Sequence, residues 1–265
     1  MPFHAAGTHT GASLDNALNK VISSYTPSIK ALGYARSQIK HTQFGQPTRD
    51  QMLITLMPET PRGANDKAGF SKLKGILVEG EKIAEIVSPY VSLVVRTRPN
   101  ANEVLAQLEN CQISHFACHG MSNPTDPSSS GLVLQRLARD GTFEQDHLSV
   151  YRIAQLRLRY AKLAYLSACS TAENNGARLQ DKVIHIVSGF QVAGFPHVIG
   201  SLGPAGDEEC VQVASRLYSS VFEHGGVPYI EGQRVAMAVR EAVMAVRAQD
   251  MDMPLNWAQL VHFGA

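Results

Sequence analysis

The chain has 265 residues, of which 44% are hydrophobic and 18% are charged, so it can bury one large core or two modest ones. The 24 basic and 23 acidic residues leave a formal net charge of +1, which gives no electrostatic footprint for nucleic acid or for an anionic membrane. We therefore expect one α/β domain over residues 1–265 that binds neither nucleic acid nor membrane.

Localisation and redox state follow from what the sequence lacks. No apolar run approaches the roughly 20 residues of a membrane span, and residues 1–11 lack the charged start and apolar centre of a signal peptide. We expect a cytoplasmic protein. Four cysteines do not make a disulfide framework in a chain of this length, and no C-x-x-C pair suggests zinc. The thiols are predicted to be unbridged, with no cofactor.

The first predicted elements are two short helices. Ser13 is expected to cap the first helix, whose apolar residues recur at helical spacing from Leu14 to Ile22. Pro27 suits the first turn of the second helix, which carries Ile29.

A β-α-β unit is predicted next. Residues 51–57 and 91–97 are apolar, β-branched and closed by prolines, as strands are, and residues 73–86 between them show helical spacing. Asn100 and Glu103 resemble a capping box for a further helix.

The middle of the chain predicts a strand at 113–119, followed by a polar loop at 121–130 that is long enough to form a binding rim. Residues 131–137 and 141–148 predict a hairpin around the Asp-Gly pair at 140–141.

Alternation of helices and strands continues to the end of the chain. Ser149 is expected to cap a short helix, and residues 161–168 form the next predicted strand. The loop at 174–176 is expected to be mobile. The remaining predicted elements are a helix at 183–190, a strand at 197–202, helices at 211–222 and 233–248, and a strand at 254–263.

Two of the predicted strands end at a reactive side chain followed by small residues. His119 follows ISHFAC and Cys169 follows LAYLSA, and parallel strands deliver such residues to one carboxyl edge of a sheet. Their separation is 169 − 119 = 50 residues, similar to caspases, where the histidine lies about 50 residues upstream of the cysteine. This pattern predicts a cysteine–histidine dyad.

The chemistry of such a dyad needs a thiolate, a base and an oxyanion site. His119 can take the proton of Cys169, because a free thiol is mostly protonated at neutral pH. The backbone N–H groups of Gly120 and Cys169 are candidate oxyanion donors. The alternative is that both side chains are ordinary residues at the edge of a sheet.

Other histidines and cysteines have plainer interpretations. The even spacing of His115 and His119 can place both on one side of a strand, so His115 is either a supporting group behind the site or part of the packed core. Cys118 should point away from His119. We expect Cys111, Cys118 and Cys210 to be structural. A zinc site around the dyad would need a fourth ligand, and none is evident.

Three motifs together resemble the CHAT family, caspase-like peptidases that are often joined to tetratricopeptide repeats and are related to separase. The motifs are HFACHG at 115–120, LSACST at 166–171 and GFQVAGFPHVIG at 189–200. The resemblance also covers PFHAAG at 2–7 and the ending at 257–264. It implies a caspase-like three-layer α/β sandwich, with a mostly parallel central sheet and helices on both faces.

The resemblance also assigns roles. It makes His119 the catalytic histidine and Cys169 the nucleophile of a cysteine endopeptidase that cleaves protein substrates, as a regulated signalling or cell-death protease. A tetratricopeptide-repeat or sensor domain is the implied partner. The alternative is a catalytically silent CHAT interaction module within a larger sensor protein.

Two departures from the family stand out. Members usually carry a tryptophan where this chain has Gly203, although the acidic position that follows is retained as Asp207. Members also usually have a strand before PFHAAG, whereas this chain begins there. We therefore expect that the chain lacks its first strand or comes from a larger protein, with the sheet edge open or supplied by a partner.

The substrate pocket is expected to be uncharged. Related metacaspases use an acidic side chain two positions before the nucleophile to recognise a basic residue, and Ser167 occupies that position here. Arg178 can reach the pocket, and Asp207 can either tune it or cap the following helix. We predict a preference for an uncharged or small residue before the scissile bond, with discrimination added by the rim at 121–130.

Overall fold

A computed structural model describes residues 2–10, 13–41, 50–63, 69–123, 125–167, 180–203, 206–222, 230, 233–249 and 251–265. Within them, the main sheet has six strands in the order β2-β1-β3-β7-β8-β9, with every neighbouring pair parallel except β8 and β9. The strands are β1 (Gln51–Leu56), β2 (Ser92–Thr97), β3 (Ile113–Ala117), β7 (Leu163–Leu166), β8 (His197–Ser201) and β9 (Leu260–Gly264).

Helices cover both faces of this sheet, as predicted. Alternate side chains of β1 enter opposite layers: Met52 and Ile54 belong to one apolar cluster, and Leu53 belongs to the other. The first layer contains α3 (Ile76–Val87), α7 (Asp207–Phe222) and α8 (Gln233–Arg247). The second contains α4 (Ala101–Leu108), α5 (Val150–Ala154) and α6 (Gln180–Ala193). The predicted three-layer α/β sandwich is confirmed.

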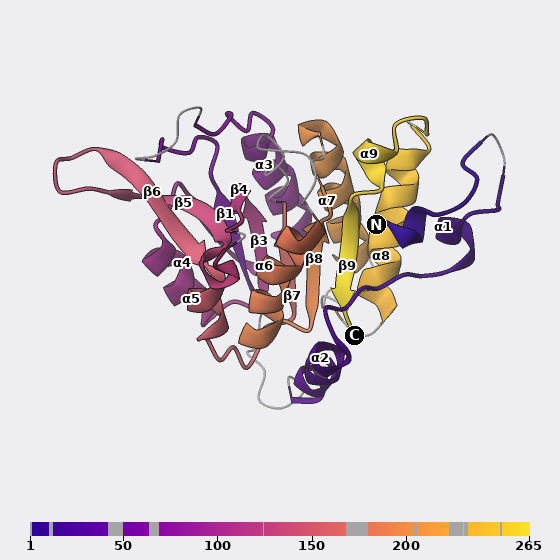
Figure 1. Cartoon of the computed structure of the whole chain (residues 1–265), viewed down its shortest axis with the longest axis horizontal. Coiled ribbons are helices and arrows are strands. Elements are labelled where there is room, and N and C mark those ends of the chain that lie inside the picture. Colours follow the sequence, from indigo (N-terminus) through magenta and orange to yellow (C-terminus); the bar gives the residue numbers. More distant parts are fainter. Residues whose placement is uncertain are drawn as a thin grey trace.

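A smaller antiparallel sheet joins the main sheet near its carboxyl edge. It consists of β4 (His119–Met121), β5 (Gly131–Leu137) and β6 (Phe143–Ser149), with the 3-10 helix η2 (Pro127–Ser129) before β5. The β5–β6 hairpin is the predicted one, and it extends beyond the main sheet (Figure 1). Gly141 in its turn has φ +83°, the left-handed conformation that favours glycine.

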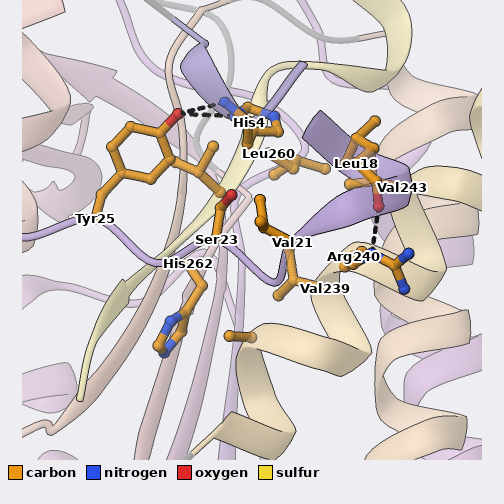
Figure 2. A pocket seen from close by; sticks show the side chains of 12 residues that line it. His4, Leu18, Val21, Ser23, Tyr25, Val239, Arg240, Val243, Leu260 and His262 are labelled. Carbon is orange, nitrogen blue, oxygen red and sulfur yellow. Dashed lines mark hydrogen bonds between the residues drawn. The ribbon is translucent and has the colours of Figure 1, made fainter. Parts of the chain in front are cut away.

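The N-terminal segment lies beside α8 at the opposite end of the molecule (Figure 1). It forms the 3-10 helix η1 (Phe3–Ala5) and the single turn α1 (Ala17–Lys20) before α2 (Ile29–His41). Figure 2 shows two of its attachments: the Tyr25 hydroxyl contacts the backbone N and Nδ1 of His4 at 3.1 and 2.9 Å, and Arg240 donates to the Leu18 carbonyl.

Two local predictions were wrong. The cap of the first helix is Asn16, whose side chain accepts from the Asn19 N–H, and the helix ends at Lys20 rather than continuing through Ile22. Beyond it the chain is extended, because Tyr25 pairs with the outer edge of β9: its N–H donates to His262 O and its carbonyl accepts from Gly264 N–H. The predicted last strand also begins late, after the short helix α9 (Pro254–Trp257).

Other predicted boundaries are close to the observed ones. The capping box of Asn100 and Glu103 is complete, and the Ser149 side chain accepts from the Arg152 N–H at the start of α5. The predicted loop at 174–176 lies outside the described residues. No helix in the described part of the chain is long and apolar enough to cross a bilayer.

Candidate active site

The strands that precede His119 and Cys169 are neighbours in the main sheet. β3 pairs with β7 in parallel, and Phe116 lies opposite Leu166 at the carboxyl ends of the two strands. Ser167, the first residue after β7, is buried. Cys169 comes two residues later and lies outside the described residues, so its contact with His119 remains a prediction. The pairing nevertheless brings the two chain segments to one edge of the sheet.

His119 does not end β3, as the sequence suggested. β3 stops at Ala117, and the chain crosses at the buried Cys118 into β4, where His119 lies opposite Val133 of β5. Cys118 belongs to the apolar cluster beneath α4 and α6. The sequence missed this change of sheet because the partner strand β5 follows ten or more residues later and sets the register of β4 through its own hairpin.

The ring of His119 is held on two sides and is 1% exposed. Its Nε2 lies 2.8 Å from the carbonyl oxygen of Ser71, and its ring stacks on Phe70 with centroids 4.6 Å apart. A carbonyl oxygen only accepts hydrogen bonds, so in the neutral ring Nε2 carries the proton and Nδ1 carries the lone pair. Nδ1 is therefore the atom that can receive a proton. No motif in the sequence pointed to Phe70 or Ser71.

The remaining predicted site residues are placed only in part. Gly120 is buried in β4, opposite Leu132. Arg178 lies outside the described residues. Asp207 is the first residue of α7, but its side chain is not among those described. The structure thus brings Gly120 and Ser167 to the same edge region as His119 through the β3–β7 pair.

His115 is packed in the core, on the side of the sheet covered by α3 and α7. Its Nε2 is 3.2 Å from Glu79 Oε1, close in distance but not aligned as a hydrogen bond, and its Nδ1 is 3.3 Å from the Tyr218 hydroxyl. The ring also stacks on Tyr165, with centroids 4.9 Å apart. Burial, together with the Glu79 charge, raises the pKa of Tyr218 well above its usual value. The sequence did not predict this buried cluster.

The three described cysteines are buried and form no disulfide with one another. Burial raises the pKa of the Cys111 thiol to about 12, so it stays protonated. No group of three or more histidine, cysteine, aspartate or glutamate side chains suited to a metal ion occurs among the described residues.

Gly203, where the resemblance predicts a tryptophan, faces Gln259. A Cβ added at Gly203 would lie 2.7 Å from Gln259 Oε1, so no larger side chain fits without displacing that amide. The Leu202 N–H donates to the Gln259 carbonyl, which fixes the two segments together. The carboxyl end of β8 is therefore bordered by a neutral amide instead of an indole.

Comparisons with solved structures identify the fold. Gingipain R, an Arg-specific cysteine proteinase, is 13% identical with a TM-score of 0.51, over 86% of this chain and 51% of that chain. The Porphyromonas gingivalis RgpB complex of pro- and mature domains is 11% identical with a TM-score of 0.51, over 86% of this chain and 52% of that chain. The Saccharomyces cerevisiae separase–securin complex is 16% identical with a TM-score of 0.53, over 91% of this chain and 14% of that chain.

These similarities establish a caspase-like cysteine protease fold. The chain spans about half of the gingipain chain and a small part of the separase chain. No curated protein matches the sequence. The model of the CHAT domain matches residues 1–265, and the chain therefore belongs to the CHAT domain family.

Proposed function

We propose that this protein is a cysteine endopeptidase in which Cys169 is the nucleophile and His119 the general base. The observation that carries the proposal is the β3–β7 pairing, which sends the segments containing these two residues to one edge of the sheet. The orientation of His119 supports it, because the Ser71 carbonyl fixes the ring in the tautomer whose Nδ1 accepts a proton.

The proposed reaction has two halves. The Cys169 sulfur, deprotonated by His119, attacks the scissile carbonyl carbon, and the backbone N–H groups of Gly120 and Cys169 stabilise the oxyanion. His119 then protonates the leaving amine as the C–N bond breaks, which leaves a thioester. Water, deprotonated by His119, attacks the thioester and releases the acid and the thiol. The chemistry needs no metal or cofactor.

A thiol-reactive peptide probe tests the dyad. A peptide carrying an acyloxymethyl ketone should label the protein by mass spectrometry, and the label should be lost in Cys169→Ala and weakened in His119→Ala. The control is Cys118→Ala, because the Cys118 side chain is buried in the apolar cluster beneath α4 and α6. Labelling that survives Cys169→Ala would reject the assignment of the nucleophile.

The substrate pocket is proposed to prefer an uncharged or small residue before the scissile bond. Ser167 is buried and neutral, and Gln259 rather than a charged group borders the neighbouring strand end. Arg178 and Asp207 complete the proposed pocket. A peptide-library profile of the active, unlabelled protein checks this: strict selection for arginine, lysine or aspartate would contradict it.

One observation favours the second candidate, a catalytically silent module of a larger sensor protein. His119 is 1% exposed and contacts Phe70 and Ser71, so a substrate reaches it only after the residues that cover it move. A tetratricopeptide-repeat or sensor domain is the proposed partner that would uncover His119 and make the protein active. If no probe labels the protein under any activating condition, the silent module is the better description.

A further inference from the structure

A large cavity lies between α2 and α6, away from the sheet edge that carries His119. Its volume is about 560 Å³, and α2 and the residues before it form one wall. The other wall consists of Ser188, Gln191 and Val192 of α6, with Arg157 from the loop after α5. Tyr34 bridges the two helices only by a long hydrogen bond of 3.4 Å to the Val192 carbonyl. Figure 1 shows α2 at the bottom edge of the molecule, close to the C-terminus.

Gln191 is the unusual residue of this cavity. Its side chain is 2% exposed, yet neither Nε2 nor Oε1 has a hydrogen-bond partner in the part of the chain that the structure describes. A buried amide that pairs with nothing destabilises a protein by about 1–3 kcal/mol, so such groups are rare and call for an explanation. A carboxamide has donors and an acceptor, which together match the C=O and N–H of an extended peptide.

The rim of the cavity is basic on both sides. The described residues that line the cavity include two cations, Lys30 and Arg157, and no acidic residue. Lys30 and Arg157 line the cavity and form no ion pair within the described ranges. Tyr34 and Val192 add apolar surface, being 38% and 48% exposed. Since the whole chain has a net charge of only +1, this face is locally positive.

We propose that this cavity is a docking groove for an acidic, extended peptide segment of a partner protein. The peptide main chain pairs with the carboxamide of Gln191 once Tyr34 gives up its long bond to Val192. Carboxylates of the peptide face Lys30 and Arg157, and its apolar side chains contact Tyr34 and Val192. The groove is separate from the proposed dyad, so docking does not depend on catalysis.

Fluorescence anisotropy with a defined probe tests the proposal. The probe is a labelled peptide of three Asp-Leu-Glu-Val repeats, compared with the same peptide carrying lysine at each acidic position and with single-stranded oligo-dT of equal length. The acidic peptide should bind best. The double variant Lys30→Glu/Arg157→Glu should bind the acidic peptide at least tenfold more weakly, and it should bind the lysine peptide better than the acidic one. Lys82→Glu is the matched control, because Lys82 is exposed on α3, and it should change binding of the acidic peptide less than twofold.

The role of Gln191 has its own readout. Gln191→Met keeps the size of the side chain. It should weaken binding of the acidic peptide about tenfold, the equivalent of one lost hydrogen bond to a buried group. In the parent protein the side-chain amide resonances of Gln191, assigned by their absence in the variant, should shift when peptide is added. An unchanged urea midpoint in Gln191→Met separates lost binding from lost folding.

Three results would overturn the proposal. One is no binding of the acidic peptide at millimolar concentration, and another is equal binding by the charge-reversed double variant. The third is tighter binding of oligo-dT that competes with the peptide, which would make the groove a nucleic-acid site.

Discussion

At the scale of single residues, the proposed chemistry depends on how His119 is held. An imidazole is useful as a base only when its lone pair is on the nitrogen that faces the thiol. The Ser71 carbonyl and the Phe70 ring hold both the tautomer and the plane of the ring, although neither residue belongs to a recognisable motif. The contact that orients the base therefore comes from a loop far from it in sequence.

Glu79 gives a stability prediction at the same scale. Its side chain is buried, with Oε1 3.2 Å from His115 Nε2, and truncating a buried side chain to alanine leaves a cavity that costs about 2–5 kcal/mol. Glu79→Ala should therefore lower the free energy of unfolding by about 2 kcal/mol, measured by urea denaturation. Glu81→Ala, an exposed neighbour on the same helix, should change it by less than about 0.5 kcal/mol. Equal effects of the two variants would mean that the buried Glu79 side chain contributes nothing.

At the scale of elements, the C-terminal strand β9 depends on contacts with β8 and with the N-terminal segment of the chain. It pairs with β8 on one side and with Tyr25 on the other. His197 Nδ1 lies 3.0 Å from His262 Nε2, and His262 Nδ1 lies 2.9 Å from Ser24 Oγ, which donates to the Gly264 carbonyl. This row of polar groups connects β8, β9 and the N-terminal segment.

The histidine pair predicts that stability falls in acid. Burial lowers the pKa of His197 to about 4, and burial with the neighbouring His197 lowers the pKa of His262 well below its usual value. Between pH 6.5 and 4 the unfolded chain therefore binds more protons than the folded one, so stability is full above pH 6.5 and declines as the pH falls toward 4. Urea midpoints measured across this range should decline.

The matched variant is His197→Gln/His262→Gln, which cannot take up these protons. It should show a shallower decline than the parent protein, although His4, whose burial lowers its pKa to about 4, keeps part of the dependence. An identical pH dependence in parent and variant would show that the His197–His262 pair does not cause the loss of stability in acid.

Two glycines predict opposite effects of the same substitution. Gly194 follows α6 with φ +131°, and a Cβ there would lie 2.4 Å from the Leu158 carbonyl oxygen. Gly194→Ala should lower the free energy of unfolding by about 1–3 kcal/mol. Gly33 lies in α2 with nothing within 4 Å of an added Cβ, so Gly33→Ala should raise it by about 0.5–1 kcal/mol. Thermal or urea unfolding measures both, and stabilisation by Gly194→Ala would contradict the backbone argument.

At the scale of the whole molecule, the proposed catalytic edge and the basic groove lie at separate places on one sandwich. The edge is bordered by neutral side chains such as Ser167, whereas the groove carries Lys30, which forms no ion pair with any residue that the structure describes. This separation allows a partner to be held at one place and a substrate to be cut at the other.

Metal and redox dependence is a prediction for the whole protein. Probe labelling should be unchanged by chelator, because the proposed reaction uses only protein groups. Peroxide or alkylation should abolish labelling, because both modify the Cys169 thiolate. A reductant should restore the labelling that is lost to mild peroxide treatment. The buried Cys111, with its raised pKa, should react much more slowly. A strict calcium requirement for labelling would contradict the prediction that chelator has no effect.

The sequence by itself determined the local structure where short-range interactions decide it. The capping box of Asn100 and Glu103 and the Asp-Gly hairpin turn were predictable, because their partners lie within a few residues. β1 was predictable from its own apolar, β-branched run, although its partner strands are distant in sequence. The fold class followed from the alternation of such elements. The proposed roles of His119 and Cys169 came from motifs in the sequence and remain predictions.

Only the tertiary structure decided what depends on distant partners. The segment after Lys20 is extended because it pairs with β9, about 240 residues away, although its apolar spacing predicted a helix. The tautomer of His119, the burial of Glu79 against His115 and the unpaired amide of Gln191 also depend on residues that the local sequence does not specify. Hydrogen-bond geometry and desolvation act between groups that are close in space, and the packing of the sandwich alone determines which groups those are.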